Sequence, residues 1–172
     1  MYLSGNLIKK IDHLVSLPNL QTLDLSFNRL IEINNFWVPG NNLDKLRTLN
    51  LAKNMIRQIK NLDKLSSLEH LDLSDNKVIE LSGLEKLLNL KTLNLQGNLL
   101  EYIDLPEMAN LQDLNLRRNK ISIVNKLAGF VCLMKLNLGQ NLIKSISNLE
   151  HTLPALKELT LDQNPVAATI SS

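Results

Sequence analysis

The chain has 172 residues, a net charge of +2 and 44% hydrophobic residues, which suits one domain with its own core. It has no run of 18 apolar residues, so no membrane span is expected, and its first ten residues lack the apolar stretch of a secretory signal. The single cysteine, Cys132, excludes an internal disulfide and a cysteine metal cage. Because the charge is near neutral, nucleic acid is a disfavoured partner.

Leucine and asparagine dominate the composition, with 40 and 22 copies, which indicates one structural unit used many times. The segment Leu71-Asp-Leu-Ser-Asp-Asn76 recurs in variants, and the asparagine that ends each copy is here named the marker asparagine. The markers are Asn6, Asn28, Asn54, Asn76, Asn98, Asn119, Asn141 and Asn164. Their spacings are 22, 26, 22, 22, 21, 22 and 23 residues. The full unit reads LxxLxLxxNxIxxIxxLxxLxx.

In chain order, eight short strands are expected at residues 1–3, 23–25, 49–51, 71–73, 93–95, 114–116, 136–138 and 159–161. In each LxL segment the two leucines have the period of two that places both on one side of a strand. The apolar residues that follow each marker recur every third residue, which predicts a 3₁₀ or irregular helical return. One unit cannot bury its leucines alone, so the units are expected to stack as a solenoid.

The repeat unit resembles the leucine-rich repeat of the 22-residue class named after a protein phosphatase-1 regulatory subunit. The resemblance covers essentially the whole chain. It implies an α/β, right-handed solenoid with about eight parallel strands on a concave face and helical returns on the convex face. Residues 1–172 are interpreted as a single domain and as a fragment of a longer protein with one or both caps missing, because neither end shows the polar cap that a solenoid needs.

The four extra residues between Asn28 and Asn54 lie within the segment 34–42. Pro39-Gly40 and the asparagines around it are typical of a turn. This segment contains Phe36 and also Trp37, which is the only tryptophan in the sequence. One interpretation is an exposed loop with an aromatic anchor for a partner, and the other is that both rings cover the core.

The strand residues that point away from the core form polar columns along the predicted concave face. The column between the two strand leucines is almost entirely Asp or Asn, and a basic spot occurs in the second half of the chain. These columns suggest hydrogen bonding and charge complementarity more than an apolar groove. The candidate partner-binding residues are Asp24, Asp72, Asn94, Asn115, Arg117, Arg118 and Lys135, with Phe36 and Trp37 as a second choice.

The sequence contains no arrangement typical of an enzyme, and neither a metal nor a cofactor is expected. His13, His70 and His151 fall at different positions of the repeat, with only His70 on the concave face. Cys132 lies in an apolar stretch, which predicts a buried or half-buried thiol. No phosphate-binding loop, nucleophile elbow or HExxH motif is present.

The residues favour a non-catalytic scaffold that binds another protein, or a neighbouring domain, through a polar concave surface. No small-molecule substrate is expected. The lone cysteine favours a cytoplasmic location, without excluding the nucleus. The resemblance implies narrower settings: the ciliary and microtubule-associated members, such as the leucine-rich light chain of outer-arm dynein, or a phosphatase-regulatory subunit. A component of an RNA–protein complex, like the spliceosomal A-prime protein, and the targeting domain of a larger enzyme are alternatives.

Overall fold

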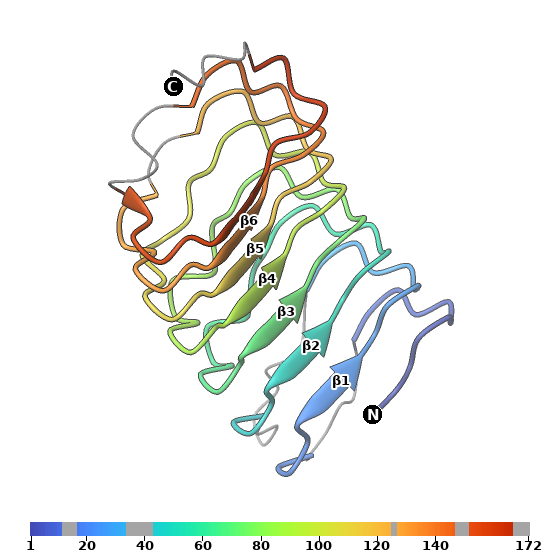
Figure 1. The fold of residues 1–172 in the computed structure, drawn as a ribbon. Coiled ribbons are helices and arrows are strands. Elements are labelled where there is room, and N and C mark those ends of the chain that lie inside the picture. The colour runs from blue at the N-terminus through green and yellow to red at the C-terminus, as the bar shows by residue number, and fades with distance from the viewer. Residues whose placement is uncertain (12–16, 34–42, 125–126, 147–151, 167–172) are drawn as a thin grey trace.

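The structure is a computed structural model that describes residues 1–11, 17–33, 43–124, 127–146 and 152–166. Seven strands of three residues form one parallel sheet in sequential order (Figure 1). They are β1 (Thr22–Asp24), β2 (Thr48–Asn50), β3 (His70–Asp72), β4 (Thr92–Asn94), β5 (Asp113–Asn115), β6 (Lys135–Asn137) and β7 (Glu158–Thr160). The chain is therefore a parallel-strand solenoid.

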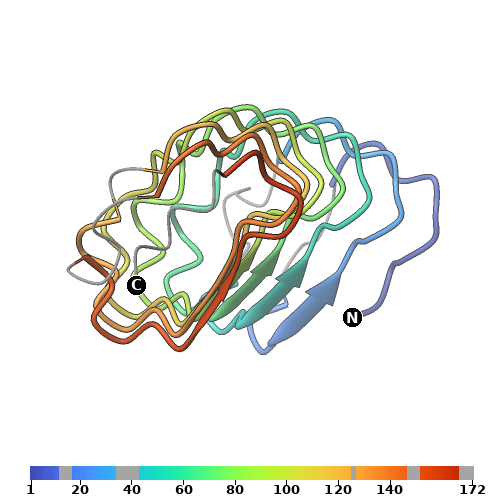
Figure 2. The ribbon, with the colours of Figure 1, turned by 45° about the horizontal axis from the view of Figure 1, so that its top comes forward.

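Each repeat pairs with the next in the same register. Leu49 of β2 lies opposite Leu23 of β1 and Leu71 of β3, so equivalent residues line up along the stack. These leucines are fully or almost fully buried, whereas the residues beside them are half-buried or exposed. Figure 2 shows the coils wrapping around one interior, which the leucines and isoleucines of all repeats fill as a continuous core.

The prediction of eight strands was wrong by one. The first copy of the repeat pairs with β1 only through an isolated bridge between Tyr2 and Asp24. The N–H of Leu3 donates to the carbonyl of Asp24 at 2.8 Å, and the N–H of Asp24 donates to the carbonyl of Met1 at 3.0 Å. This pairing continues the ladder, but it is too short to make a strand.

The prediction of helical returns was also wrong, because between residues 43 and 124 the returns consist of turns and bends. In the third return, the N–H of Leu65 donates to the carbonyl of Leu62, and that of Leu68 to the carbonyl of Leu65. These inward-pointing leucines are buried at a spacing of three, as the sequence predicts. Only every third N–H makes such a bond, so the return is a series of single turns and not a 3₁₀ helix.

The marker asparagines join successive repeats, as their structural interpretation predicts. The buried Asn76 accepts a hydrogen bond from the N–H of Ile56 at 3.0 Å. Its amide donates to the carbonyls of Leu51 in the preceding repeat and of Leu73 in its own repeat. Six further marker asparagines repeat this pattern, from Asn28 to Asn164. The ladder satisfies backbone groups that stacking removes from water.

Candidate interaction surface

The Asp and Asn column of the concave face supports the backbone of its own repeat. The Oδ1 atom of Asp24 accepts a hydrogen bond from the N–H of Ser26 at 2.9 Å, and Oδ1 of Asp72 accepts one from the N–H of Ser74 at 2.8 Å. Asn50, Asn94, Asn115 and Asn137 do the same. These side chains cap the strand ends as Asx turns.

Sequence reasoning missed this role, although a column restricted to Asp and Asn was a signal for it. The four predicted contact residues of this column (Asp24, Asp72, Asn94, Asn115) are half-buried and lie on one face. The second oxygen of Asp72 accepts a hydrogen bond from Asn94 at 3.2 Å. Each of these groups therefore has a structural bond and keeps part of its polar surface toward solvent.

Arg117 has a partner two repeats away. Its guanidinium donates to both carboxylate oxygens of Asp162, at 2.7 and 2.9 Å. Gly139 lies between them, and a Cβ atom there would collide with the side chains of both. The hydrogen bond from Arg117 lowers the pKa of Asp162, and the bond to Asp162 raises the pKa of Arg117. Because Gly139 in the intervening repeat has no side chain, there is room for a bidentate ion pair across it.

The other cations of the predicted basic spot also face carboxylates. Arg118 lies 3.6 Å from Asp75, and Lys135 lies 2.8 Å from Glu158. The hydrogen bond to Glu158 raises the pKa of Lys135. The structure brings the three predicted cations onto one face, where each is compensated by an acid of another repeat.

Two aromatic side chains are exposed at the opposite end of the concave face. Tyr2 is 78% exposed and Phe27 is 54% exposed. The ammonium group of Lys53 lies 4.4 Å from the centre of the Phe27 ring. Phe27 directly precedes a marker asparagine and has a φ of 53°, in the left-handed region. Exposed rings beside a cation are typical anchors for a protein partner.

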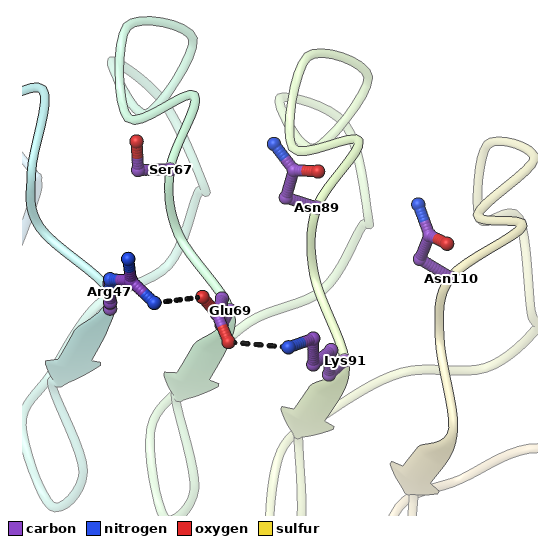
Figure 3. Close-up of a pocket in the computed structure, with 6 residues that line it drawn as sticks. All are labelled: Arg47, Ser67, Glu69, Asn89, Lys91 and Asn110. Carbon is purple, nitrogen blue, oxygen red and sulfur yellow. Dashed lines mark hydrogen bonds and ion pairs between the residues drawn. The ribbon is translucent and has the colours of Figure 1, made fainter.

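A shallow depression lies beside β2, β3 and β4 and is lined by Arg47, Ser67, Glu69, Asn89, Lys91 and Asn110. Arg47 and Lys91 both point toward Glu69 and contact it at 2.9 and 2.6 Å (Figure 3). The hydrogen bond from Lys91 lowers the pKa of Glu69. Because its charges are already paired with one another, this depression offers little to a ligand.

Other residues that the sequence analysis singled out are not part of this surface. Four of them fall outside the described residues, namely Phe36, Trp37, His13 and His151. Cys132 is exposed, so its prediction as a buried or half-buried thiol was wrong. Among the described residues, no group of His, Cys, Asp and Glu could hold a metal ion. No helix in the described part of the chain is long and apolar enough to cross a bilayer.

The family follows from comparison with known sequences. The family described as "Leucine Rich repeats (2 copies)" matches residues 1–36 and 44–86, and "Leucine Rich Repeat" matches residues 89–111. These matches cover more than half of the chain, and the chain belongs to the leucine-rich repeat family. Proteins built on this repeat generally serve as scaffolds that bind other proteins. No curated protein matches the chain.

Solved structures show the same fold. An internalin (InlF) from Listeria monocytogenes superposes with a TM-score of 0.82 at 27% identity over 96% of this chain. A leucine-rich repeat protein from Leptospira interrogans gives 0.77 at 30% identity over 88%, and TLR13 in its ssRNA13 complex gives 0.81 at 26% identity over 98%. The chain spans only 48%, 39% and 27% of those proteins.

Proposed function

We propose that this protein is a non-catalytic scaffold that binds a protein partner on its concave face. The observation that carries the proposal is the register of the seven strands, which aligns polar side chains on a sheet face that no other described segment covers (Figure 1). The asparagine ladder and the Asx caps fix the backbone that presents these side chains. A surface that is rigid before binding has a smaller ordering cost when a partner binds.

Within this face, the contact is proposed to centre on the first half of the sheet. There Asp24 and Asp72 keep carboxylate surface toward solvent, beside the exposed rings of Tyr2 and Phe27. Asn94 and Asn115 extend the polar column. The basic spot of Arg117, Arg118 and Lys135 borders this column. Its charges are already compensated, so they should contribute more to discrimination between partners than to attraction of an acidic segment. The same compensation argues against an RNA partner on this face.

The proposed setting is the cytoplasm, with a ciliary or cytoskeletal complex as the narrower proposal. It rests on the resemblance of the repeat and on the lone cysteine, Cys132. A phosphatase-regulatory role and a targeting role for a larger enzyme would use the same concave surface.

Capture from cytosolic extract tests the proposal with variants that keep the fold. Asp24→Asn and Asp72→Asn remove charge but retain the capping oxygen, as Asn50 shows in its own repeat. Phe27→Asn removes the ring and tolerates a positive φ. The matched control is Asp63→Asn with Val131→Asn, both on exposed returns.

The triple variant is expected to lose a partner that the wild type and the control variant retain. Affinity for that partner, measured with purified components, should fall at least tenfold. Equal capture by the triple variant would overturn concave binding.

A further inference from the structure

The segments that directly follow the marker asparagines form a second regular surface. The residues one and three positions after each marker make up this surface, here named the flank. The N–H of Met55 donates to the carbonyl of Leu30 at 2.8 Å, and that of Lys77 donates to the carbonyl of Ile56 at 2.9 Å. Leu30 and Ile56, two positions after their markers, are buried. Flank side chains therefore point outward in register from repeat to repeat.

Apolar and cationic side chains alternate on the flank of the first four repeats. Each repeat carries one of each kind, and the two kinds exchange positions from one repeat to the next. The apolar members are Leu7, Ile31, Met55 and Ile79, which are 67%, 54%, 42% and 53% exposed. The cationic members, all exposed, are Lys9, Arg29, Arg57 and Lys77. The flank is thus a checkerboard in which the apolar side chains form a zigzag.

The charges of this surface differ from those of the concave face. None of its four cations has an ion-pair partner among the described residues, whereas Arg117 and Lys135 do. Glu32 borders a depression that Ile31, Arg57 and Ile79 also line, but it forms no ion pair with Arg57. Unpaired cations around exposed apolar side chains are complementary to an acidic, amphipathic partner.

The spacing of the checkerboard fits an α-helix. Successive repeats in a parallel stack lie about 4.8 Å apart, so the zigzag returns to the same column after about 9.6 Å. A helix rises about 10.5 Å per seven residues, and its a and d positions form a zigzag with steps of about 5 Å. Over three repeat-to-repeat steps the mismatch stays within about 2 Å, less than the breadth of a leucine side chain.

We propose that the flank of the first four repeats docks an amphipathic acidic α-helix of a partner protein. Apolar residues at a and d of that helix pack on Ile31, Met55 and Ile79. Glutamates at e and g contact Arg29, Arg57 and Lys77. A lipid surface lacks this periodicity, and the zigzag contains no aromatic anchor of the kind that favours membranes. This surface is separate from the concave one, so either interaction can exist without the other.

A designed helix tests the proposal. The probe is a fluorescent peptide of about three heptads, with Leu at a and d and Glu at e and g. The reference peptide has the same composition in scrambled order, and vesicles of phosphatidylserine report membrane binding. We expect anisotropy to show at least tenfold tighter binding of the patterned peptide than of the scrambled one, with vesicles unbound.

Matched variants locate the site. The double variant Ile31→Glu with Ile79→Glu should weaken binding of the patterned peptide at least tenfold. The double variant Arg29→Glu with Lys77→Glu should also weaken this binding, and its effect should be largest at low salt. The control Lys64→Glu with Lys86→Glu, on exposed returns, should leave binding unchanged, as should the concave triple variant. Circular dichroism confirms that each variant folds.

Three outcomes would each overturn the proposal. They are equal binding of the two peptides, insensitivity to Ile31→Glu with Ile79→Glu in a folded variant, and binding of vesicles in place of the patterned peptide. The concave proposal is tested by capture of a partner and the flank by binding of the patterned peptide, so failure of the flank and failure of the proposed function are distinguished.

Discussion

Replacement of Asn76 by alanine tests whether the asparagine ladder holds the repeats together. Asn76 is 2% exposed, and its side chain makes the only hydrogen bond to the N–H of Ile56 within the described parts of the chain. Its carbonyl partners each keep a second donor, as Leu51 does from Asn54 and Leu73 from Asn98. The main cost of Asn76→Ala is therefore one buried N–H without an acceptor, together with the space left by the amide.

The expected loss is a large fraction of the stability of a domain of this size. A buried donor left unsatisfied costs about 1–3 kcal/mol, and the void adds about 1 kcal/mol. The free energy of unfolding should thus fall by about 2–4 kcal/mol. At about 2–4 °C per kcal/mol, the melting temperature should fall by roughly 4–16 °C. Asn76→Asp should be at least as damaging, because a buried carboxylate would face carbonyl oxygens.

Asn6 provides the matched control within the same chain. It occupies the same position of the repeat, but it is exposed, and among the residues that the structure describes it bonds only the carbonyls of Leu3 and Ser4, at 3.0 and 3.3 Å. Asn6→Ala should cost less than about 1 kcal/mol, the value of an ordinary hydrogen bond. Urea unfolding followed by circular dichroism measures both losses, and hydrogen exchange at the Ile56 amide localises the first. Equal losses for the two variants would refute the ladder as a source of stability.

Other predictions concern a glycine, pH and the free thiol. Gly83 has a φ of 88°, and a Cβ atom there would collide with a backbone carbonyl of the preceding repeat. Gly83→Ala should cost about 2–4 kcal/mol in urea unfolding, against about 1 kcal/mol for Gly5→Ala, which has a positive φ and open space. The pKa values of Asp162 and Glu69 are lowered in the fold. Their contribution to stability is present above their ordinary values of 3.8 and 4.5 and is lost as pH falls through the folded pKa, which a melting series should show. Cys132 should react with a thiol reagent in the native state, and protection until unfolding would contradict its exposure.

The core was predictable from the sequence because the repeat leaves few choices. Each LxL segment stacks on an equivalent segment in the next repeat, so its leucines must point inward. Leu23, Leu49 and Leu71 do so. The prediction for Cys132 was wrong because it rested on the apolar stretch around the residue and not on the spacing of three. Its apolar neighbours Phe130 and Leu133 occupy the inward positions, which leaves Cys132 on the outside of the turn.

The details of the candidate site were less predictable. Whether Asp72 binds a partner or its own backbone depends on the strand end that follows it, which the repeat pattern alone does not describe. The bond between Arg117 and Asp162 joins residues 45 positions apart and requires the gap at Gly139. Such contacts arise when the repeats stack in three dimensions. The sequence pattern therefore shows which residues lie on the same face, but not which of them contact one another.

This pairing implies that the basic second half of the concave face and the flank should respond differently to salt. In that half of the concave face, Arg117, Arg118 and Lys135 are compensated by carboxylates of other repeats, so the field that reaches a distant partner is weak. Binding there must depend on short-range hydrogen bonds and packing, which screening affects little. On the flank, Arg29 and Lys77 have no such compensation, so docking should accelerate at low salt. A solenoid with a compensated region on one surface and uncompensated cations on another can therefore hold two partners whose affinities change differently with ionic strength.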